Sequence, residues 1–439
     1  MKLMRLLPLS AAIALALAGQ ARAEGLLELY EAARAYDANW QAAKYQYDAN
    51  IARAAQAKAG ILPQVGLSGS VTRNGVDVAP SPDRQYTQQS VTLSASQPLY
   101  RPANLATYRQ GKRQAELAEF QLTAASQDLI IRVSQAYFDV LAAEDTLAFV
   151  RAQKTATAEQ LASAKRNFEV GTTTITDTRE AQARMDLVLA QEIAAENDLR
   201  VKRLALDTVV GKRDTQPAPM SAPTVMPPPN PATPDAWVSA AEAASPQILQ
   251  ARTNVEIAEL ETEKARAGHK PTVDLTANVG ETRFVGGSST STLDSRPKTG
   301  AVGVALNFPL FAGFATQNRI RETLALEEKA RTDLEAARRQ VAQTVRTAYF
   351  GVVSGQGQVK ALEAAEASSQ SSLDANRLGY QVGVRINIDV LNAQSQLYQT
   401  KRDLAQARYN VLLGHLKLRQ ATGTLQPEDL VRLNTLVIQ

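Results

Sequence analysis

The stretch LIIRVSQAYFDVLAAEDTLAFV (129–150) decides the fold, and its pattern returns 212 residues later as VAQTVRTAYFGVVSGQGQVKAL (341–362). Both copies contain Ala-Tyr-Phe, and in both small apolar residues are spaced alternately by four and three positions. These residues are Leu129, Val133, Ala136, Val140, Ala143, Leu147 and Val150, then Val341, Val345, Ala348, Val352, Gly355, Val359 and Leu362. A sustained period of 3.5 predicts long helices in left-handed coiled-coil packing, and the small side chains predict close approach.

The repetition extends over most of the chain. Segments with an offset of 212 are Val170-Gly171 with Val382-Gly383, Asp177 with Asp389, and Ala181-Gln182 with Ala393-Gln394. Upstream, Ala57-Lys58-Ala59-Gly60 matches Ala265-Arg266-Ala267-Gly268 at an offset of 208, and Pro98-Leu99-Tyr100 matches Pro309-Leu310-Phe311 at 211. The chain therefore contains two similar structural units, with a small loop insertion in the second.

Each unit has the pattern of a helix, a β-hairpin, a long helix, a tight turn and a returning helix. In the hairpins, apolar residues such as Val65, Leu67, Val91 and Leu93 alternate with Ser, Thr and Gly, which is typical of strands with one apolar face. This pattern fits a membrane barrel or a small soluble sheet. The expected ranges are 24–211 for the first unit (hairpin 64–99, long helix 102–169, returning helix 174–211), 212–235 for a Pro-rich connector, 236–423 for the second unit (hairpin 272–309, long helix 313–381, returning helix 386–423) and 424–439 for a C-terminal segment.

The N-terminus has the pattern of a secretory signal peptide over residues 1–23. A charged start is followed by an apolar run and by Ala21-Arg22-Ala23, an A-x-A cleavage site. Removing Lys2, Arg5 and Arg22 lowers the formal charge from +4 to +1, and a nearly neutral chain has no electrostatic footprint for nucleic acid. The sequence has no cysteine, which excludes disulfides, thiolate metal sites and an N-terminal lipid anchor.

The residues give no sign of catalysis. Two histidines stand in unrelated contexts, and no nucleophile elbow, P-loop or zinc motif is present, so we expect no enzyme activity, no cofactor and no metal. The informative polar residues, Asp177, Tyr380, Arg385 and Asp389, flank the two tight turns. They are able to hydrogen-bond between neighbouring hairpins, or to act as helix caps and solvated surface.

The chain resembles TolC-type outer-membrane efflux proteins over its whole processed length. The resemblance rests on the duplicated unit, on FEVGTTTITD (168–177), GYQVGVRINIDVLNAQ (379–394) and ARYNVL (407–412), and on the Leu-Pro and Pro-Leu-Phe borders of the strands. It implies a fold of helices plus a membrane β-barrel. Three chains, each giving four strands, would form a homotrimer with a 12-stranded barrel in the outer membrane, continued by a periplasmic α-helical barrel with a small mixed equatorial region.

The resemblance also implies roles for individual residues. Asp177, Tyr380 and Arg385 match a hydrogen-bonded gate that shuts the periplasmic end. Asp389 matches a carboxylate ring at the lumen constriction; the next ring position is acidic in the family pattern but is Asn392 here, which predicts a weaker cation block. The turns at Val170, Gly171, Val382 and Gly383 match surfaces where periplasmic adaptors dock.

The expected function is that of a passive outer-membrane exit duct in a tripartite efflux or type I secretion system. Its expected partners are two sister chains, outer-membrane lipid, a periplasmic adaptor (membrane fusion) protein and an inner-membrane pump of the RND, ABC or MFS type. Most of the mass is expected in the periplasm. The alternative is a soluble periplasmic coiled-coil scaffold without a pore.

Overall fold

A computed structural model describes residues 24–78, 81–219 and 228–437. The expected signal peptide and the middle of the connector lie outside the described residues. The chain divides into two compact units. The helical unit comprises Met1–Lys44, Leu122–Ile248 and Arg338–Gln439, and the sheet unit comprises Tyr45–Gln121 and Leu249–Ala337.

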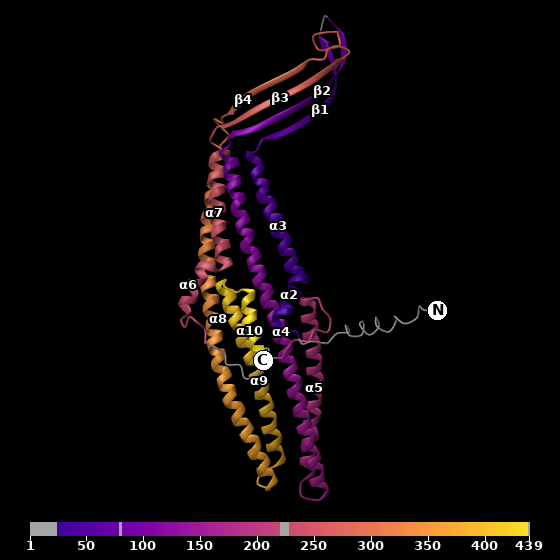
Figure 1. Ribbon diagram of the computed structural model, residues 1–439, viewed down its shortest axis with the longest axis vertical. Coiled ribbons are helices and arrows are strands. Elements are labelled where there is room, and N and C mark those ends of the chain that lie inside the picture. The colour runs from indigo at the N-terminus through magenta and orange to yellow at the C-terminus, as the bar shows by residue number, and fades with distance from the viewer. Residues whose placement is uncertain (1–23, 79–80, 220–227, 438–439) are drawn as a thin grey trace, which may run out of the picture. The chain divides into compact units, whose positions relative to one another are not determined.

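The elements follow one another as two rounds of helix, hairpin and helix (Figure 1). In chain order they are α2 (Leu26–Tyr36), α3 (Ala38–Lys58), the 3₁₀ turn η1 (Ala59–Ile61), β1 (Gln64–Val78), β2 (Ser81–Tyr100), α4 (Pro102–Glu169), α5 (Ile175–Val210), α6 (Pro234–Ala244), α7 (Pro246–Ala267), β3 (Thr272–Val285), β4 (Lys298–Asn307), α8 (Ala315–Gln381), α9 (Asn387–Thr422) and α10 (Pro427–Val437). Within the described residues, no helix is long and apolar enough to cross a bilayer.

The first helix of each repeat differs from the sequence prediction, because it is broken. The sequence predicts one helix from Glu24 to Ala59, but α2 ends at Tyr36 and α3 begins at Ala38. The Asp37 carboxylate accepts a hydrogen bond from the backbone N–H of Trp40 (2.7 Å) and so caps the second piece. The second repeat breaks at Ser245, 208 residues later, before Pro246. The repeat therefore preserves the break.

The core of the helical unit lies where the predicted coiled-coil residues of α4 meet the other helices. Leu129, Val133 and Val140 are fully buried, and Val341, Val345 and Val352 are buried in the second copy. The main cluster also includes residues of α2, α5 and α9, such as Leu29, Leu206, Tyr409, Leu412 and Leu416. Long helices need such lateral packing, because helix propensity alone does not hold them.

The Ala-Tyr-Phe motif fixes the two described ends of the Pro-rich connector. Tyr137 donates a hydrogen bond from its hydroxyl to the carbonyl of Ala218 (2.6 Å), and its repeat partner Tyr349 donates to the carbonyl of Ala232. Glu24 also exchanges backbone hydrogen bonds with the connector through Gln216 and Ala218. The described ends of the connector are thus bound to the helical unit by equivalent tyrosines.

The sheet unit contains one antiparallel sheet in the order β1-β2-β3-β4 (Figure 1). Apolar residues pair across the strands, for example Leu67 with Leu93, Leu93 with Val279, and Leu275 with Val304. Most of these side chains are exposed within one chain; Val302 is 78% exposed. Serines and threonines occupy the alternate positions, so one face is apolar and the other polar. β1 and β4 are the open edges.

Candidate functional site

The helical hairpins α4–α5 and α8–α9 end in two tight turns of the same design. Gly171 (φ 80°) and Gly383 (φ 78°) adopt left-handed backbone that side chains disfavour. Each turn presents a valine to solvent, because Val170 is 73% and Val382 65% exposed. The four residues expected at the adaptor surface therefore lie at two turns, each of which exposes an apolar side chain.

A cleft of about 800 Å³ lies between the hairpin ends. Three of its lining residues are those expected in the gate, namely Asp177, Tyr380 and Arg385, and Gly383 also lines it. Val170, Gly171, Val382, Asp389 and Asn392 are not among its lining residues. The fold thus brings the three expected gate residues to one cleft from two different repeats.

Within one chain, these three side chains bond to other partners rather than to one another. Asp177 accepts hydrogen bonds from the N–H (3.2 Å) and hydroxyl (3.3 Å) of Thr174, and so caps α5. The hydroxyl of Tyr380 accepts a hydrogen bond from the Asn167 amide (3.3 Å). Arg385 forms an ion pair with Asp389 at 3.6 Å. The helix-capping interpretation thus describes the Asp177 side chain.

The absence of a side chain at Gly379 makes room for the Arg385 side chain. A Cβ added at Gly379 would lie 2.7 Å from Cγ of Arg385, so a larger residue would displace the arginine. The backbone N–H of Arg385 also donates to the carbonyl of Gly379 (3.1 Å). The Gly-Tyr-Gln-Val-Gly part of the motif therefore serves both the turn and the arginine.

Asn387 is the connection that the sequence analysis missed. Its side chain is 1% exposed in a position between the hairpins. Its amide donates to the backbone carbonyl of Asp177 (3.2 Å) and accepts a hydrogen bond from the Gln160 amide. Deeper in the same interface, the Gln394 amide donates to the carbonyl of Gln153 and the hydroxyl of Thr157, both at 3.3 Å. Gln394 belongs to the Ala-Gln pair that both repeats contain, so the sequence could have indicated its importance. Asn387 has no counterpart in the first repeat that could have done so.

Asp389 and Asn392 lie one helical turn apart on α9. The Asp389 side chain is 34% exposed and faces Arg385. Asn392 is exposed, and its side-chain oxygen accepts a hydrogen bond from Arg184 of α5 at 2.8 Å. A carboxylate at position 392 would form an ion pair with that guanidinium, so the asparagine also lowers the negative charge available at this level.

A second buried polar contact joins α4 and α9 farther from the turns. The Tyr409 hydroxyl donates to the Asp145 carboxylate at 2.7 Å. Burial raises the pKa of Asp145, although the tyrosine hydrogen bond opposes the shift. Burial also raises the pKa of Tyr409. The phenol therefore stays protonated and acts as a donor.

The two hairpins are held differently along their length. Five ion pairs join α4 to α5: Lys202–Asp139, Arg203–Glu144, Arg151–Glu192, Arg151–Glu196 and Lys154–Glu192. Two join α8 to α9: Lys401–Glu366 and Arg408–Glu363. The first hairpin thus carries more ion pairs between its two helices than the second.

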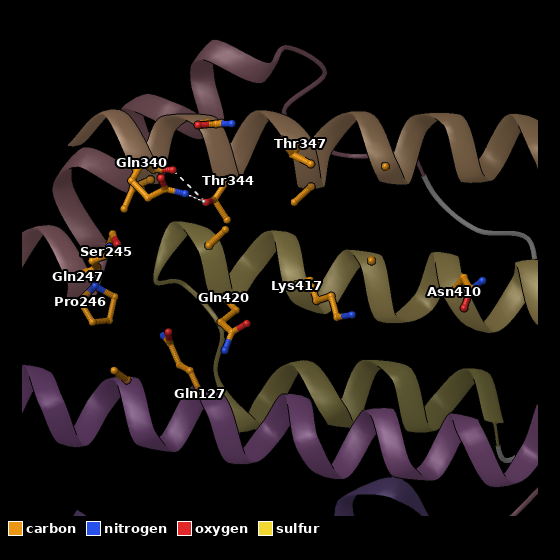
Figure 2. A pocket seen from close by; sticks show the side chains of 17 residues that line it. Gln127, Ser245, Pro246, Gln247, Gln340, Thr344, Thr347, Asn410, Lys417 and Gln420 are labelled. Atoms are coloured by element: carbon orange, nitrogen blue, oxygen red, sulfur yellow. Dashed lines mark hydrogen bonds between the residues drawn. The ribbon is translucent and has the colours of Figure 1, made fainter. Parts of the chain in front are cut away.

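Sequence divergence between the repeats leaves a second cleft, of about 730 Å³, among α4, α8, α9 and the α6–α7 break (Figure 2). In the first repeat, Arg132 donates two hydrogen bonds to Asp37 (2.7 and 3.0 Å), and Lys202 pairs with Asp139 (3.1 Å). Small residues replace all four in the second repeat. The equivalent pairs are Asp37 and Ser245, Arg132 and Thr344, Asp139 and Gly351, and Lys202 and Gly414. All four replacements line the cleft, so the cleft lies where the second repeat lacks the charged side chains of the first.

Comparison with known proteins agrees with this architecture. The family model "Outer membrane efflux protein" matches residues 29–212 and 237–424, one match for each repeat. The chain is 33% identical to the outer membrane protein TolC of Vibrio cholerae (98% of each chain) and 33% identical to the alkaline protease secretion protein AprF of Pseudomonas aeruginosa (95% of this chain, 88% of the relative).

Solved structures show the same fold. The outer membrane protein VceC of Vibrio cholerae superposes with a TM-score of 0.79 over 91% of this chain and 96% of VceC, at 21% identity. These matches do not favour the soluble scaffold. They agree with an outer-membrane location and with a large helical part on the periplasmic side. The chain belongs to the outer membrane efflux protein family and is an outer-membrane exit duct of the kind that efflux and secretion systems use.

Proposed function

We propose that three copies of this chain close into one passive duct, which an inner-membrane pump and a periplasmic adaptor supply with substrate. The carrying observation is the four-stranded sheet, whose apolar face is exposed and whose edge strands β1 and β4 each have a neighbouring strand on one side only within the described chain. In lipid, unpaired strand edges are costly, and pairing β4 of one copy with β1 of the next removes them. Three copies give a barrel of twelve strands.

The proposed gate is the cleft that contains Asp177, Tyr380 and Arg385, with Asn387 as an additional pin. The amides of Asn387 and Asn167 join α8–α9 to the ion-paired α4–α5 hairpin. The contacts from α8–α9 to this hairpin are mainly hydrogen bonds from neutral amides, and fewer ion pairs join α8 to α9 than join α4 to α5, so we expect α8–α9 to be the hairpin that moves on opening. Asp389, repeated three times around the axis, attracts cations to the constriction.

The exposed turns are the proposed adaptor surface. Val170 and Val382 present exposed apolar side chains on tight turns, which suits docking into a groove of a partner. The pump is of the RND, ABC or MFS type. Two relatives carry the names of protease secretion proteins, AprF and PrtF, which supports type I secretion beside efflux. The duct itself performs no chemistry and needs no cofactor.

Membrane fractionation and conductance test these proposals. The processed chain should sediment with outer membranes and migrate as a heat-modifiable trimer. The Tyr380→Phe, Arg385→Glu double variant should give a leaky pore of higher conductance in planar bilayers. An unchanged conductance would remove these residues from the gate, and a chain that stays soluble as a monomer would refute the duct.

A further inference from the structure

Charged residues gather on one face of the sheet, just beyond its apolar band. On β1 the apolar side runs from Val65 to Val71, and the next residue of that face is Arg73. Arg283 of β3 and Lys298 of β4 follow the apolar residues of their own strands in the same way. We call Arg73, Glu281, Arg283, Arg296 and Lys298 the distal row.

Strand register and contacts place the row on the apolar face. Gln89 pairs with both Val71 and Arg283, so Arg283 shares the face of Val71. Glu281 pairs with Lys298. The Arg73 guanidinium donates to the Gln85 amide at 3.0 Å, which puts Gln85 on the same face. Alternate positions at these levels, Thr72, Gln88, Thr282 and Thr299, are uncharged. At the levels of the distal row, the charge thus lies on the side that carries the apolar band.

The row has an excess of positive charge. It holds four basic residues and one acidic residue, a net charge of +3 per chain. Glu281 makes only long contacts, at 3.5 Å to Arg296 and 4.0 Å to Lys298. Arg283 is exposed and has no hydrogen bond or ion pair to any described residue. The acidic Asp77 and Asp83 lie farther along, near the turn between β1 and β2.

Strand length places the row at a membrane boundary. Arg73 is eight residues beyond Val65, about 27 Å along the strand. At the usual tilt this corresponds to roughly 20 Å of height, close to the apolar height of about 25 Å in outer-membrane barrels. The opposite strand ends connect to the helices, so the row belongs to the outer-leaflet side.

We propose that the distal row binds the phosphate groups of a glycolipid in the outer leaflet, a lipid whose sugar headgroup carries phosphates. Guanidinium groups form bidentate hydrogen bonds with phosphate, and the apolar band beneath them suits the acyl chains. The inference rests on the proposed barrel, since only a closed barrel presents this face to lipid.

The test uses the purified full-length trimer and three probes: diphosphoryl lipid A, dephosphorylated lipid A and phosphatidylglycerol. Lipid retained per trimer is measured after detergent washing. The Arg73→Gln, Arg283→Gln, Lys298→Gln variant removes the charge, and Arg84→Gln is the matched control, because residue 84 alternates with Gln85 and lies on the other face. Heat-modifiable migration checks that each variant is folded.

We expect at least tenfold weaker retention of diphosphoryl lipid A by the triple variant, since one basic residue near an anionic surface is worth about fivefold. Arg84→Gln and the wild type should retain it equally, and dephosphorylated lipid A should bind weakly to all. Equal retention by the triple variant, an equal loss in Arg84→Gln, or equal retention of phosphatidylglycerol overturns the proposal. If even the wild type does not migrate as a heat-modifiable trimer, the barrel itself is refuted.

Discussion

Truncation of Asn387 tests the proposed gate most directly. Asn387→Ala removes the hydrogen bond that the Asn387 amide donates to the carbonyl of Asp177 and the one that it accepts from Gln160. Asp177 and Gln160 both line the cleft between the hairpin ends and are only partly buried, so water can replace the lost partner. The net loss is therefore about 1 kcal/mol per bond, or roughly 1–2 kcal/mol per chain, rather than the larger penalty of two buried orphans.

That energy translates into a measurable opening. A loss of 1–2 kcal/mol shifts the closed-to-open equilibrium of one hairpin by about 5- to 30-fold. If the three hairpins of a trimer open together, the energies add to about 3–6 kcal/mol, and the shift is on the order of 10²- to 10⁴-fold. Single-channel recording in planar bilayers measures it as the fraction of time in high-conductance states, and its size separates independent from concerted opening.

The control is Asn376→Ala in the same hairpin. The Asn376 amide donates only to Ser372, one turn earlier in its own helix, so its loss should not change the gate. An Asn387→Ala trimer that is intact in heat-modifiability but opens no more often than the wild type would falsify the assignment of Asn387 as a pin.

Three further predictions follow from charged groups. Hydrogen bonds from Arg132 lower the pKa of Asp37, so their stabilisation is complete above the unfolded pKa of about 3.9 and is lost as pH falls through the lower folded pKa. Arg132→Met should therefore destabilise the fold by about 2 kcal/mol at pH 7, measured as a lower thermal midpoint, and the difference from wild type should disappear in acid. Burial raises the pKa of Asp145, so the charged form of this side chain destabilises the fold at pH 7. An asparagine at this position still accepts the hydrogen bond from Tyr409, so Asp145→Asn should match or exceed the wild-type thermal midpoint at pH 7. This gain should shrink as the pH falls through the raised pKa of Asp145. Asp389→Asn should weaken block of the conductance by a trivalent cation, and an unchanged block would remove the carboxylate from the constriction.

The sequence predicted those features that depend on local patterns. Period 3.5 in both copies of the Ala-Tyr-Phe stretch specifies long helices, and α4 runs from Pro102 to Glu169, the range that the spacing of prolines and glycines indicates. Alternation in the hairpins gave strands with one apolar face. Both patterns are set by neighbours a few residues apart, so one sequence is sufficient to recognise them.

The break at Asp37 shows where local patterns fail. Nothing near this residue forbids a helix, since Ala, Tyr and Asn flank it. Two hydrogen bonds from Arg132, 95 residues away, hold the carboxylate at the break. The second copy carried the signal in Pro246, which interrupts a helix by itself. At the repeat offset of 208, Pro246 corresponds to residue 38, so aligning the two repeats would have located the first break next to Asp37.

The position of the proposed gate residues at the hairpin ends was predictable, but their hydrogen bonds were not. Turn glycines and repeated motifs identify the hairpin ends, yet whether Asn387 is buried depends on which face of α9 meets α4. That choice follows from packing between hairpins of different repeats, and residue 175, the repeat partner of Asn387, is an isoleucine. Internal symmetry therefore carries no information about a contact that exists only between unlike copies.

Divergence between the repeats assigns them different mechanical roles. Ion pairs such as Arg151–Glu196 and Lys154–Glu192 join α4 to α5 within the first repeat. The links from the second repeat to this clamped hairpin are mainly neutral amides, including Asn387 and Gln394. At the cleft, where Asp177 and Gln160 are only partly buried, a neutral hydrogen bond exchanges with water at little net cost. A duct that must stay assembled and still open needs both kinds of contact. Under the proposed gating, duplication followed by divergence separates them into one hairpin that stays fixed and one that moves.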